Sequence, residues 1–551
     1  MDFAWERLPC RLRRGLLAGG VGRSHLAGLA HAALSSARVP GTDHELAGFL
    51  ARLGFDVLLA AWEEDPLNGS LAEPLLTLGR DSFSPKLRGA LTWLAEQWKP
   101  DARADRYLAK GDHERLLDMH SGRAEADPFL LRACVESLLV EGDAGRLPAL
   151  FGGLERRGWD GPGRFLLDVV RAETRLILRD YSVCGELERL AGELPLPGRL
   201  TRLAHCRHGL GEPELALRLW KGVLKAQPWN VNTLLRARDV LLGRDGETAA
   251  LPGDCSILLY TYEKSDELEN CLARLDAAGL DGCHVVALDN ASTDATPAVL
   301  SRWKSKWGTE RISAVRLDVN VGAPAARNWL LAREDVRARP FAAFLDDDAL
   351  VPEDWLGRLA AAVRSEPGAD AWGCKVVDAG RPWVVQNADL HLRPDLGREN
   401  RADAGGGQLP ALPVCDLQHQ GFDLGQFDSL RTCVSVTGCC HLFRTRSLTE
   451  QGGFDIRFSP SQFDDLDRDL RVAESGGYAV CQGFLRVEHL KRTGEAARRG
   501  ASAAGNALGN LVKLRQQHGD RQLEGVAEKL SDLTLQAVRR AERELAEGLG
   551  D

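Results

Sequence analysis

No stretch of the 551-residue sequence is apolar over the length that a membrane-spanning helix requires, so a membrane span is not expected. The nearest candidate for a targeting segment is the short apolar piece at residues 15–20, which follows Arg11, Arg13 and Arg14 and is interrupted by glycine. A secretory signal peptide has a longer apolar core. The sequence therefore does not predict a secretory signal.

An excess of positive charge is also absent. The formal net charge of −9 at pH 7 disfavours a nucleic-acid-binding protein, because such proteins usually present a basic face. The thirteen cysteines are scattered and form no CxxC pair, so the pattern predicts neither a zinc site nor a disulfide framework. Reduced cysteines of this kind are typical of a cytoplasmic protein, and we expect that localisation.

Strand-like runs of Val, Ile and Thr are nearly absent from residues 1–245, where Leu and Ala recur at three- and four-residue intervals. Residues 203–228 have the spacing of a tetratricopeptide-like helix pair, with Ala216 and Trp220 one helical turn apart. An irregular helical domain explains the same pattern equally well. This part carries no catalytic constellation, so we expect it to contact a partner protein or a substrate of the remaining part of the chain.

The pattern of apolar residues changes after a glycine- and proline-containing linker at residues 246–254. Apolar segments of strand length then alternate with helical patterns, which predicts a parallel sheet covered by helices. Polar residues follow the ends of successive strands, where open α/β sheets bind their ligands. The expected strands cover residues 255–262, 284–288, 312–317, 341–345, 371–377 and 480–487.

The fourth of these strands leads directly into Asp346, Asp347 and Asp348. Burying three unpaired carboxylates would cost more free energy than one apolar strand gains, so we expect them at the exposed end of the strand. Two carboxylates separated by one residue suit Mg²⁺ or Mn²⁺, which also hold substrate phosphates. A solvated loop with acidic residues is the alternative interpretation.

Five segments resemble family 2 glycosyltransferases in content and order, and the resemblance covers about residues 254–490. That family has the GT-A fold and inverts the configuration at the sugar carbon. The resemblance implies a Rossmann-like α/β GT-A domain with a mixed, mainly parallel sheet at residues 255–500, preceded by an all-α domain at 1–245 and followed by a helical segment at 501–551. The five segments are residues 260–262, 289–294, 320–328, 346–348 and 463–467.

The same resemblance implies a role for individual residues in transfer from a nucleotide-sugar donor, with a UDP-sugar as the expected donor and a protein or glycan as the acceptor. Asp465 would be the catalytic base, and Asp348 and His489 would hold Mn²⁺ or Mg²⁺. Donor binding would involve Thr261, Tyr262, Asp289, Asn290, Arg327, Asp346 and Asp347.

Each of these assignments has a structural alternative. The acidic box at residues 289–294 could instead form an Asx-turn that caps the next helix. Asp464 and Asp465 could serve only as acids that favour a helix N-terminus. A lone histidine such as His489 is more often a surface or packing residue than a metal ligand. We expect acceptor contacts in the long mixed region at 378–432, and the basic segment at 491–499 to be either a lid or a plain loop.

Two other functions remain alternatives. A sugar nucleotidyltransferase would also use a carboxylate-held metal on an α/β sheet, and a non-enzymatic scaffold would account for the long helical region. A sugar nucleotidyltransferase normally carries a glycine-rich signature near its first strand, which residues 260–264 lack. A non-enzymatic helical scaffold with a decayed transferase domain is disfavoured by the intact acids at 346, 348 and 465. We therefore expect a metal-dependent, inverting glycosyltransferase.

Overall fold

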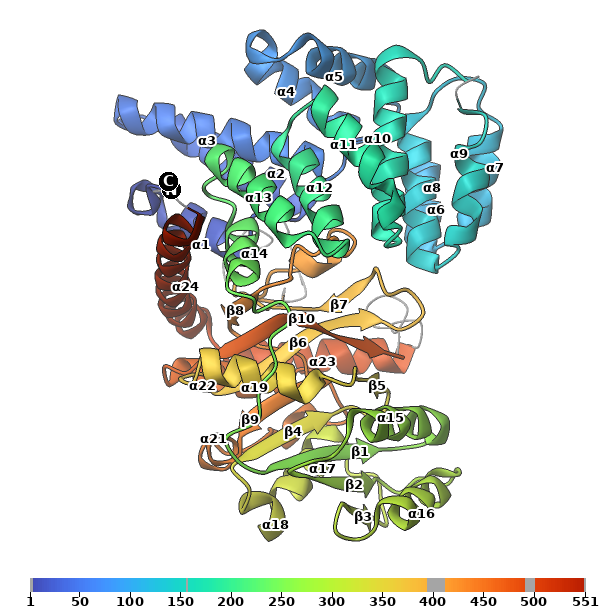
Figure 1. Cartoon of the computed structure of the whole chain (residues 1–551), viewed down its shortest axis with the longest axis vertical. Coiled ribbons are helices and arrows are strands. Elements are labelled where there is room, and N and C mark those ends of the chain that lie inside the picture. The colour runs from blue at the N-terminus through green and yellow to red at the C-terminus, as the bar shows by residue number, and fades with distance from the viewer. Residues whose placement is uncertain (1–2, 155–156, 394–411, 491–500, 550–551) are drawn as a thin grey trace. The chain divides into compact units, whose positions relative to one another are not determined.

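The computed structural model describes residues 3–154, 157–393, 412–490 and 501–549 (Figure 1). The basic segment at 491–499 and residues 394–411 of the mixed region at 378–432 lie outside the described residues. Two compact units emerge from the contacts along the chain. The first comprises Met1–Ala237, His419–Gln426 and Leu545–Asp551, and the second comprises Arg238–Gln418 and Phe427–Glu544. The domain bounds expected from the sequence remain a prediction, since composition alone set them.

The first unit is helical. Some of its helices begin where a short polar side chain accepts hydrogen bonds from free backbone N–H groups: Asp43 caps α3, and Asp127 caps α8 ahead of a proline at the first helical position. The helices of this part of the chain are α1 (Cys10–Ala18), α2 (Arg23–Ala37), α3 (His44–Glu63), α4 (Ala72–Gly79), α5 (Pro85–Gln97), α6 (Ala102–Lys110), α7 (His113–Ser121), α8 (Pro128–Glu141), α9 (Leu147–Phe151), α10 (Gly161–Ile177), α11 (Cys184–Glu193), α12 (Pro197–Gly209), α13 (Pro213–Ala226) and α14 (Val231–Leu241).

Helices α12 and α13 form the pair that the sequence pattern suggested. The chain turns between them at Gly211, whose φ of +76° favours glycine. Ala216 and Trp220 on α13 are both fully buried, and the two helices pack against each other. A tetratricopeptide repeat extending beyond this pair remains a prediction.

The second unit is built on one sheet that contains ten strands among the described residues. The strand order is β3-β2-β1-β4-β9-β6-β10-β5, with β7 on β6 and β8 on β10. Strands β3, β2, β1 and β4 run parallel, whereas β9 runs antiparallel to β4 and to β6. The strands are β1 (Cys255–Thr261), β2 (Cys283–Asp289), β3 (Ile312–Arg316), β4 (Phe341–Leu345), β5 (Ala349–Leu350), β6 (Ala371–Asp378), β7 (Val385–Asn387), β8 (Leu430–Cys433), β9 (Cys440–Arg444) and β10 (Ala479–His489).

Helices cover both faces of this sheet, which explains why its central strands are apolar throughout. Ile257 and Leu259 of β1 pack into the core beneath α15, α16 and α19, whereas Leu258 packs into the core beneath α17. Successive residues of a strand point to opposite faces, so an unbroken apolar run requires two cores. The helices of this part are α15 (Ser265–Ala278), α16 (Thr296–Trp307), α17 (Ala323–Leu331), α18 (Glu334–Arg337), α19 (Trp355–Ser365), α21 (Thr445–Glu450), α22 (Asp464–Glu474), α23 (Ala501–Gln517) and α24 (Asp520–Leu549).

A third apolar cluster joins the C-terminal helices to the second unit. Leu514 of α23 and Leu523 of α24 pack there with Leu466 and Leu470 of α22. The prediction of an α/β domain with a mixed sheet after an all-α region is confirmed. Among the described residues, no helix combines the length and the apolarity that crossing a membrane would take.

Truncating a side chain between the sheet and its helices should destabilise the second unit. Leu272 of α15 is fully buried in the same cluster as Trp303. We expect Leu272→Ala to lower the free energy of unfolding by about 2–5 kcal/mol, because it removes apolar contacts and leaves a cavity. Urea denaturation followed by tryptophan fluorescence measures this change.

Leu242→Ala is the matched control, because the Leu242 side chain is 45% exposed. Its effect should stay within about 0.5 kcal/mol. Equal shifts in the two variants would contradict the placement of Leu272 in the core.

Candidate functional site

The acidic triplet at residues 346–348 follows β4 directly, and its three side chains lie in different environments. The Asp346 side chain is 25% exposed, whereas Asp347 and Asp348 are buried. The sequence leaves the roles within the triplet open; the fold turns Asp346 toward solvent and the other two inward.

Lys264 and His489 compensate the buried charges of the triplet. The Lys264 ammonium lies 2.9 Å from Asp347 and 2.6 Å from Asp348, and His489 Nε2 lies 2.9 Å from the other oxygen of Asp348. Burial raises the pKa of Asp347 to about 6, although Lys264 opposes this shift. For Asp348 the effect of burial is outweighed by His489 and Lys264, which together lower the pKa of that carboxyl. Asp348 is therefore the permanently charged member of the pair.

Hydrogen bonds to both ring nitrogens fix the orientation of the His489 side chain. Gln386 donates to Asp378 through its Nε2, so its Oε1 accepts from His489 Nδ1 at 2.8 Å. The other ring nitrogen, Nε2, lies 2.9 Å from a carboxylate oxygen of Asp348. The ring therefore contacts Gln386 with one nitrogen and Asp348 with the other.

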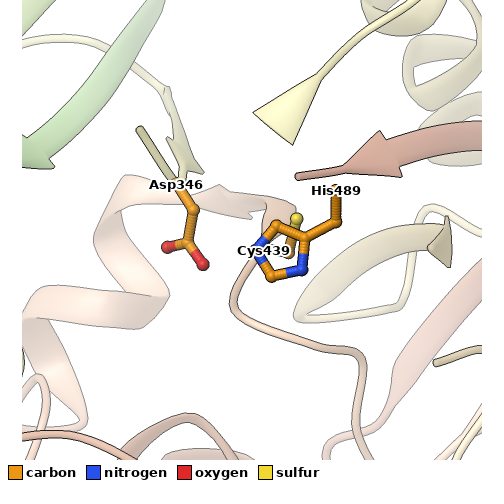
Figure 2. Close-up of side chains that lie close together, drawn as sticks. All are labelled: Asp346, Cys439 and His489. Atoms are coloured by element: carbon orange, nitrogen blue, oxygen red, sulfur yellow. The ribbon is translucent and has the colours of Figure 1, made fainter. Parts of the chain in front are cut away.

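A divalent cation fits the side chains that meet here. Ligand atoms of Asp346, Cys439 and His489 all lie within 4.8 Å of one another. The Asp346 carboxylate and the His489 ring point toward each other, with the Cys439 thiol beside the ring (Figure 2). Carboxylate oxygen and imidazole nitrogen are common ligands of Mn²⁺, and Gln386 orients the ring as second partners of metal-bound histidines do. The structure thus brings the two predicted metal ligands, Asp348 and His489, into contact.

Arg327 is the main positive charge on the other side of Asp346. Its guanidinium bonds the Asp464 carboxylate at 2.7 Å and lies 3.7 Å from Asp346. The rings of Tyr260 and Phe454 flank it at 5.2 and 5.1 Å from their centroids. Burial raises the pKa of Asp464, and Arg327 opposes that shift. Arg327 therefore links the end of β4 to the start of α22.

Asp465, the predicted base, differs from its neighbour Asp464. Asp465 is only partly buried, whereas Asp464 is 3% exposed. Its Oδ2 accepts from the backbone N–H of Gly438 at 2.8 Å, and its Oδ1 lies 2.8 Å from the Leu466 backbone nitrogen. Phe463, immediately before the helix, has a φ of +70°, a strained conformation for a bulky residue. The local backbone thus holds Asp465 at the surface of the helix start.

Asp289 and Asp294 both serve the turn after β2. Asp289 accepts from the Ser292 backbone N–H at 2.8 Å and lies 3.1 Å from Arg316. Asp294 accepts from the backbone N–H of Thr296 at 3.0 Å, at the beginning of α16. The capping role is therefore present in the structure, and the expected contact of Asp289 with a nucleobase stays a prediction.

Asn290 also has partners within the protein. Its side chain donates to Asn320 at 2.9 Å and accepts from the Val321 backbone at 3.0 Å, which ties two strand ends together. Thr261 ends β1 opposite the end of β2 and is buried, whereas the Tyr262 side chain is 46% exposed. Both lie between the turn after β2 and the triplet after β4, because β1 is the strand between β2 and β4.

Four residues at this site were not predicted as functional: Tyr260, Lys264, Gln386 and Cys439. Tyr260 donates to Asp346 at 3.3 Å. Lys264 lies two residues beyond the predicted donor segment, and its charge next to a strand end was the available signal. Gln386 falls in a region of the sequence without a recognisable motif. Nothing in the sequence around Cys439 indicates a functional role, and the tertiary fold alone places it at the site.

Comparison with known proteins finds one family model and several solved structures that are similar to part of this chain. Residues 256–450 match the model of glycosyl transferase family 2. Similar solved structures include TarS of S. aureus (15% identity, TM-score 0.28, covering 42% of this chain and 35% of that chain) and GalNAc-T7 with UDP, GalNAc and Mn²⁺ (12%, 0.34, 48% and 47%). Another is the mannosyltransferase PcManGT from Pyrobaculum calidifontis with GDP-Man and Mn²⁺ (18%, 0.30, 58% and 91%).

The chain spans about a third of TarS and about half of GalNAc-T7. No curated protein matches it in sequence. Residues 256–450, which contain strands β1–β4 and the acidic triplet, form a glycosyl transferase family 2 domain.

Proposed function

We propose that the protein transfers a sugar from a nucleotide-sugar donor to a hydroxyl group of a protein or glycan acceptor, with the aid of Mn²⁺ or Mg²⁺. The observation that carries this proposal is the meeting of Asp346, Asp348 and His489 at the strand ends of a family 2 domain. If Asp348 and His489 formed only a structural pair, neither a third ligand group nor the partly exposed carboxylate of Asp346 would be needed beside them.

Asp346, Asp348 and His489 would hold the metal ion. When bound, the ion supplies Lewis-acid stabilisation to the departing diphosphate, which contributes several kcal/mol to catalysis. Lys264 keeps Asp348 charged and adds a second cation beside the triplet. Exposed Tyr262 and the turn after β2 offer surface for the nucleoside, in line with the UDP-sugar that we expect as donor.

Asp465 would accept the proton of the acceptor hydroxyl. Backbone N–H groups hold its carboxylate in place, and the ion pair of Asp464 with Arg327 positions the start of α22. A base in this position lets the acceptor oxygen attack the sugar carbon as the diphosphate departs. A single displacement of this kind inverts the configuration at that carbon.

Loss of Asp348 should abolish metal-dependent nucleotide binding. We expect one of UDP, GDP and dTDP to bind the intact protein in calorimetry with Mn²⁺ and to bind at least tenfold more weakly with EDTA. Asp348→Ala should remove this difference, because a metal ligand is missing. Asp354→Ala is the control, since that side chain is 41% exposed and pairs with Arg358 on the surface. Absence of binding by all three nucleotides would favour a scaffold instead.

Replacing the base should slow the chemistry and leave donor binding intact. We expect Asp465→Asn to lower the rate of diphosphate release from the bound donor by about 10²–10⁴-fold, the usual contribution of a general base. The dissociation constant of the nucleotide should change less than twofold. Asp281→Asn, in an exposed turn, should match the intact protein. Full activity in Asp465→Asn would rule out this role.

The stereochemistry of the product tests the single displacement. Proton NMR of the reaction at early times should show a first product with the anomeric configuration opposite to that of the donor. Retention of configuration would contradict direct attack by an acceptor activated at Asp465.

A further inference from the structure

The start of α22, which carries Asp465, is held by the C-terminal helices of the same compact unit. Asn510 of α23 is 2% exposed, and its amide donates to the backbone carbonyls of Phe458 and Ser461 at 2.7 and 2.9 Å. These two carbonyls belong to the segment that immediately precedes α22. The C-terminal helices therefore fix the path by which the chain enters the helix of the proposed base.

A second set of contacts joins the C-terminal helices to Asp467, two residues after Asp465. Asp467 is fully buried. Its Oδ1 accepts from Gln517 at 2.7 Å and lies 2.9 Å from His518 Nε2, and its Oδ2 accepts from Arg471 at 3.0 Å. A buried carboxylate is costly unless it is compensated, so these partners determine where its side chain lies. Because Asp467 belongs to the first turn of α22, they also determine where that turn lies.

His518 bridges two carboxylates of α22. It is 1% exposed, and its Nδ1 lies 2.9 Å from Oε1 of Glu474 while its Nε2 faces Asp467. An ionised carboxylate can only accept a hydrogen bond and a neutral imidazole carries one N–H, so the protonated ring is the form that makes both bonds. Burial lowers the pKa of His518, but its hydrogen bonds to Asp467 and Glu474 and the charges of these groups outweigh burial and raise the pKa above its usual value of 6.5.

Other charged side chains on the elements around His518 have partners of their own. The ion pairs are Arg471 with Asp467 on α22, Arg457 with Asp455 before α22, and Arg515 of α23 with Asp520 of α24. Lys513 donates to the backbone carbonyl of Arg457. Histidine is the residue type in this set whose ordinary pKa lies between about 5 and 8, so a change of pH in that range acts on the bridge through His518.

We propose that His518 is a positioning residue for Asp465: as an imidazolium it joins α22 to the C-terminal helices and holds the first turn of α22 in place. The role toward Asp465 rests on the proposed transferase function, whereas the bridge itself does not. His518 lies outside residues 256–450, which match the family model.

The bridge makes the stability of this part of the protein depend on pH. The pKa of His518 is higher in the folded protein than the usual 6.5 of an unfolded chain. The stabilisation that the bridge contributes is therefore fully present below pH 6.5 and is lost as the pH rises through the folded-state pKa.

NMR of the full-length protein with carbon-13-labelled histidine measures the protonation of His518. The signal that disappears in His518→Gln, or in His518→Lys if the first variant does not fold, identifies the residue. We expect its titration midpoint to lie above pH 6.5. Glu474→Gln, at a side chain that is 29% exposed, should lower this midpoint by at least about 0.5 pH unit, because it removes one of two neighbouring negative charges. A midpoint at or below 6.5, or one that Glu474→Gln leaves in place, would overturn the bridge.

Hydrogen exchange, measured without donor, tests whether the bridge holds the start of α22. We expect the amides of residues 458–470 to exchange at least tenfold faster in His518→Gln than in the intact protein at pH 6. The difference should shrink as the pH rises through the midpoint found by NMR. His44→Gln is the matched control, because His44 is exposed and lies in the first unit, and it should exchange like the intact protein. Equal exchange in His518→Gln and the intact protein at pH 6 would contradict the proposal.

Kinetics test the role toward Asp465. His518→Gln should lower kcat at least tenfold at pH 6 and change the dissociation constant of the nucleotide less than twofold, because the proposed donor site lies at the strand ends and not on α22. Faster exchange with an unchanged kcat would refute the positioning role. An intact protein without transferase activity would refute the proposed function, and the NMR and exchange results would still decide whether the bridge exists.

Discussion

The catalytic unit depends on how it compensates charge at the end of a buried strand. Strand β4 is apolar on both faces and ends in three carboxylates, two of which the fold then buries. Lys264 supplies the opposite charge from the segment after β1, and the His489 ring contacts Asp348 from the end of β10. Lys264 immediately precedes α15, and His489 is the last residue of β10. Their contacts with the triplet therefore hold the start of α15 and the end of β10 beside the end of β4.

A buried ion pair joins a functional segment to the scaffold. Arg327 and Asp464 connect α17 with the start of α22, and Asp469 of that helix accepts a hydrogen bond from the Ser435 hydroxyl. Such pairs contribute little to stability compared with apolar packing, but removing one partner leaves a costly buried charge. The ion pairs therefore restrict the positions of Asp465 and Asp346. The positive φ of Phe463 lies at the start of the same helix, next to these contacts.

The helical unit uses the same chemistry with a different result. There the pairs of Arg132 with Asp65 and of Arg23 with Glu136 hold α2, α8 and the end of α3 together. A short segment from between β7 and β8 forms part of this unit. The sequence offers no sign of that placement, since the periodicity of helices says nothing about which distant loop packs among them.

The sequence by itself determined six strands of the second unit, β1 to β4, β6 and β10, because strands buried on both faces must be apolar throughout. Strands β5, β7, β8 and β9 were not among those expected from the sequence. The sequence also determined that Asp346 to Asp348, Asp465 and His489 stand at the ends of these elements. Only the tertiary structure decided which acid of the triplet meets solvent, that Lys264 and Gln386 support the others, and that Cys439 lies among them. These relations depend on side chains separated by tens to hundreds of residues, whose proximity follows from the packing of the sheet and not from local pattern.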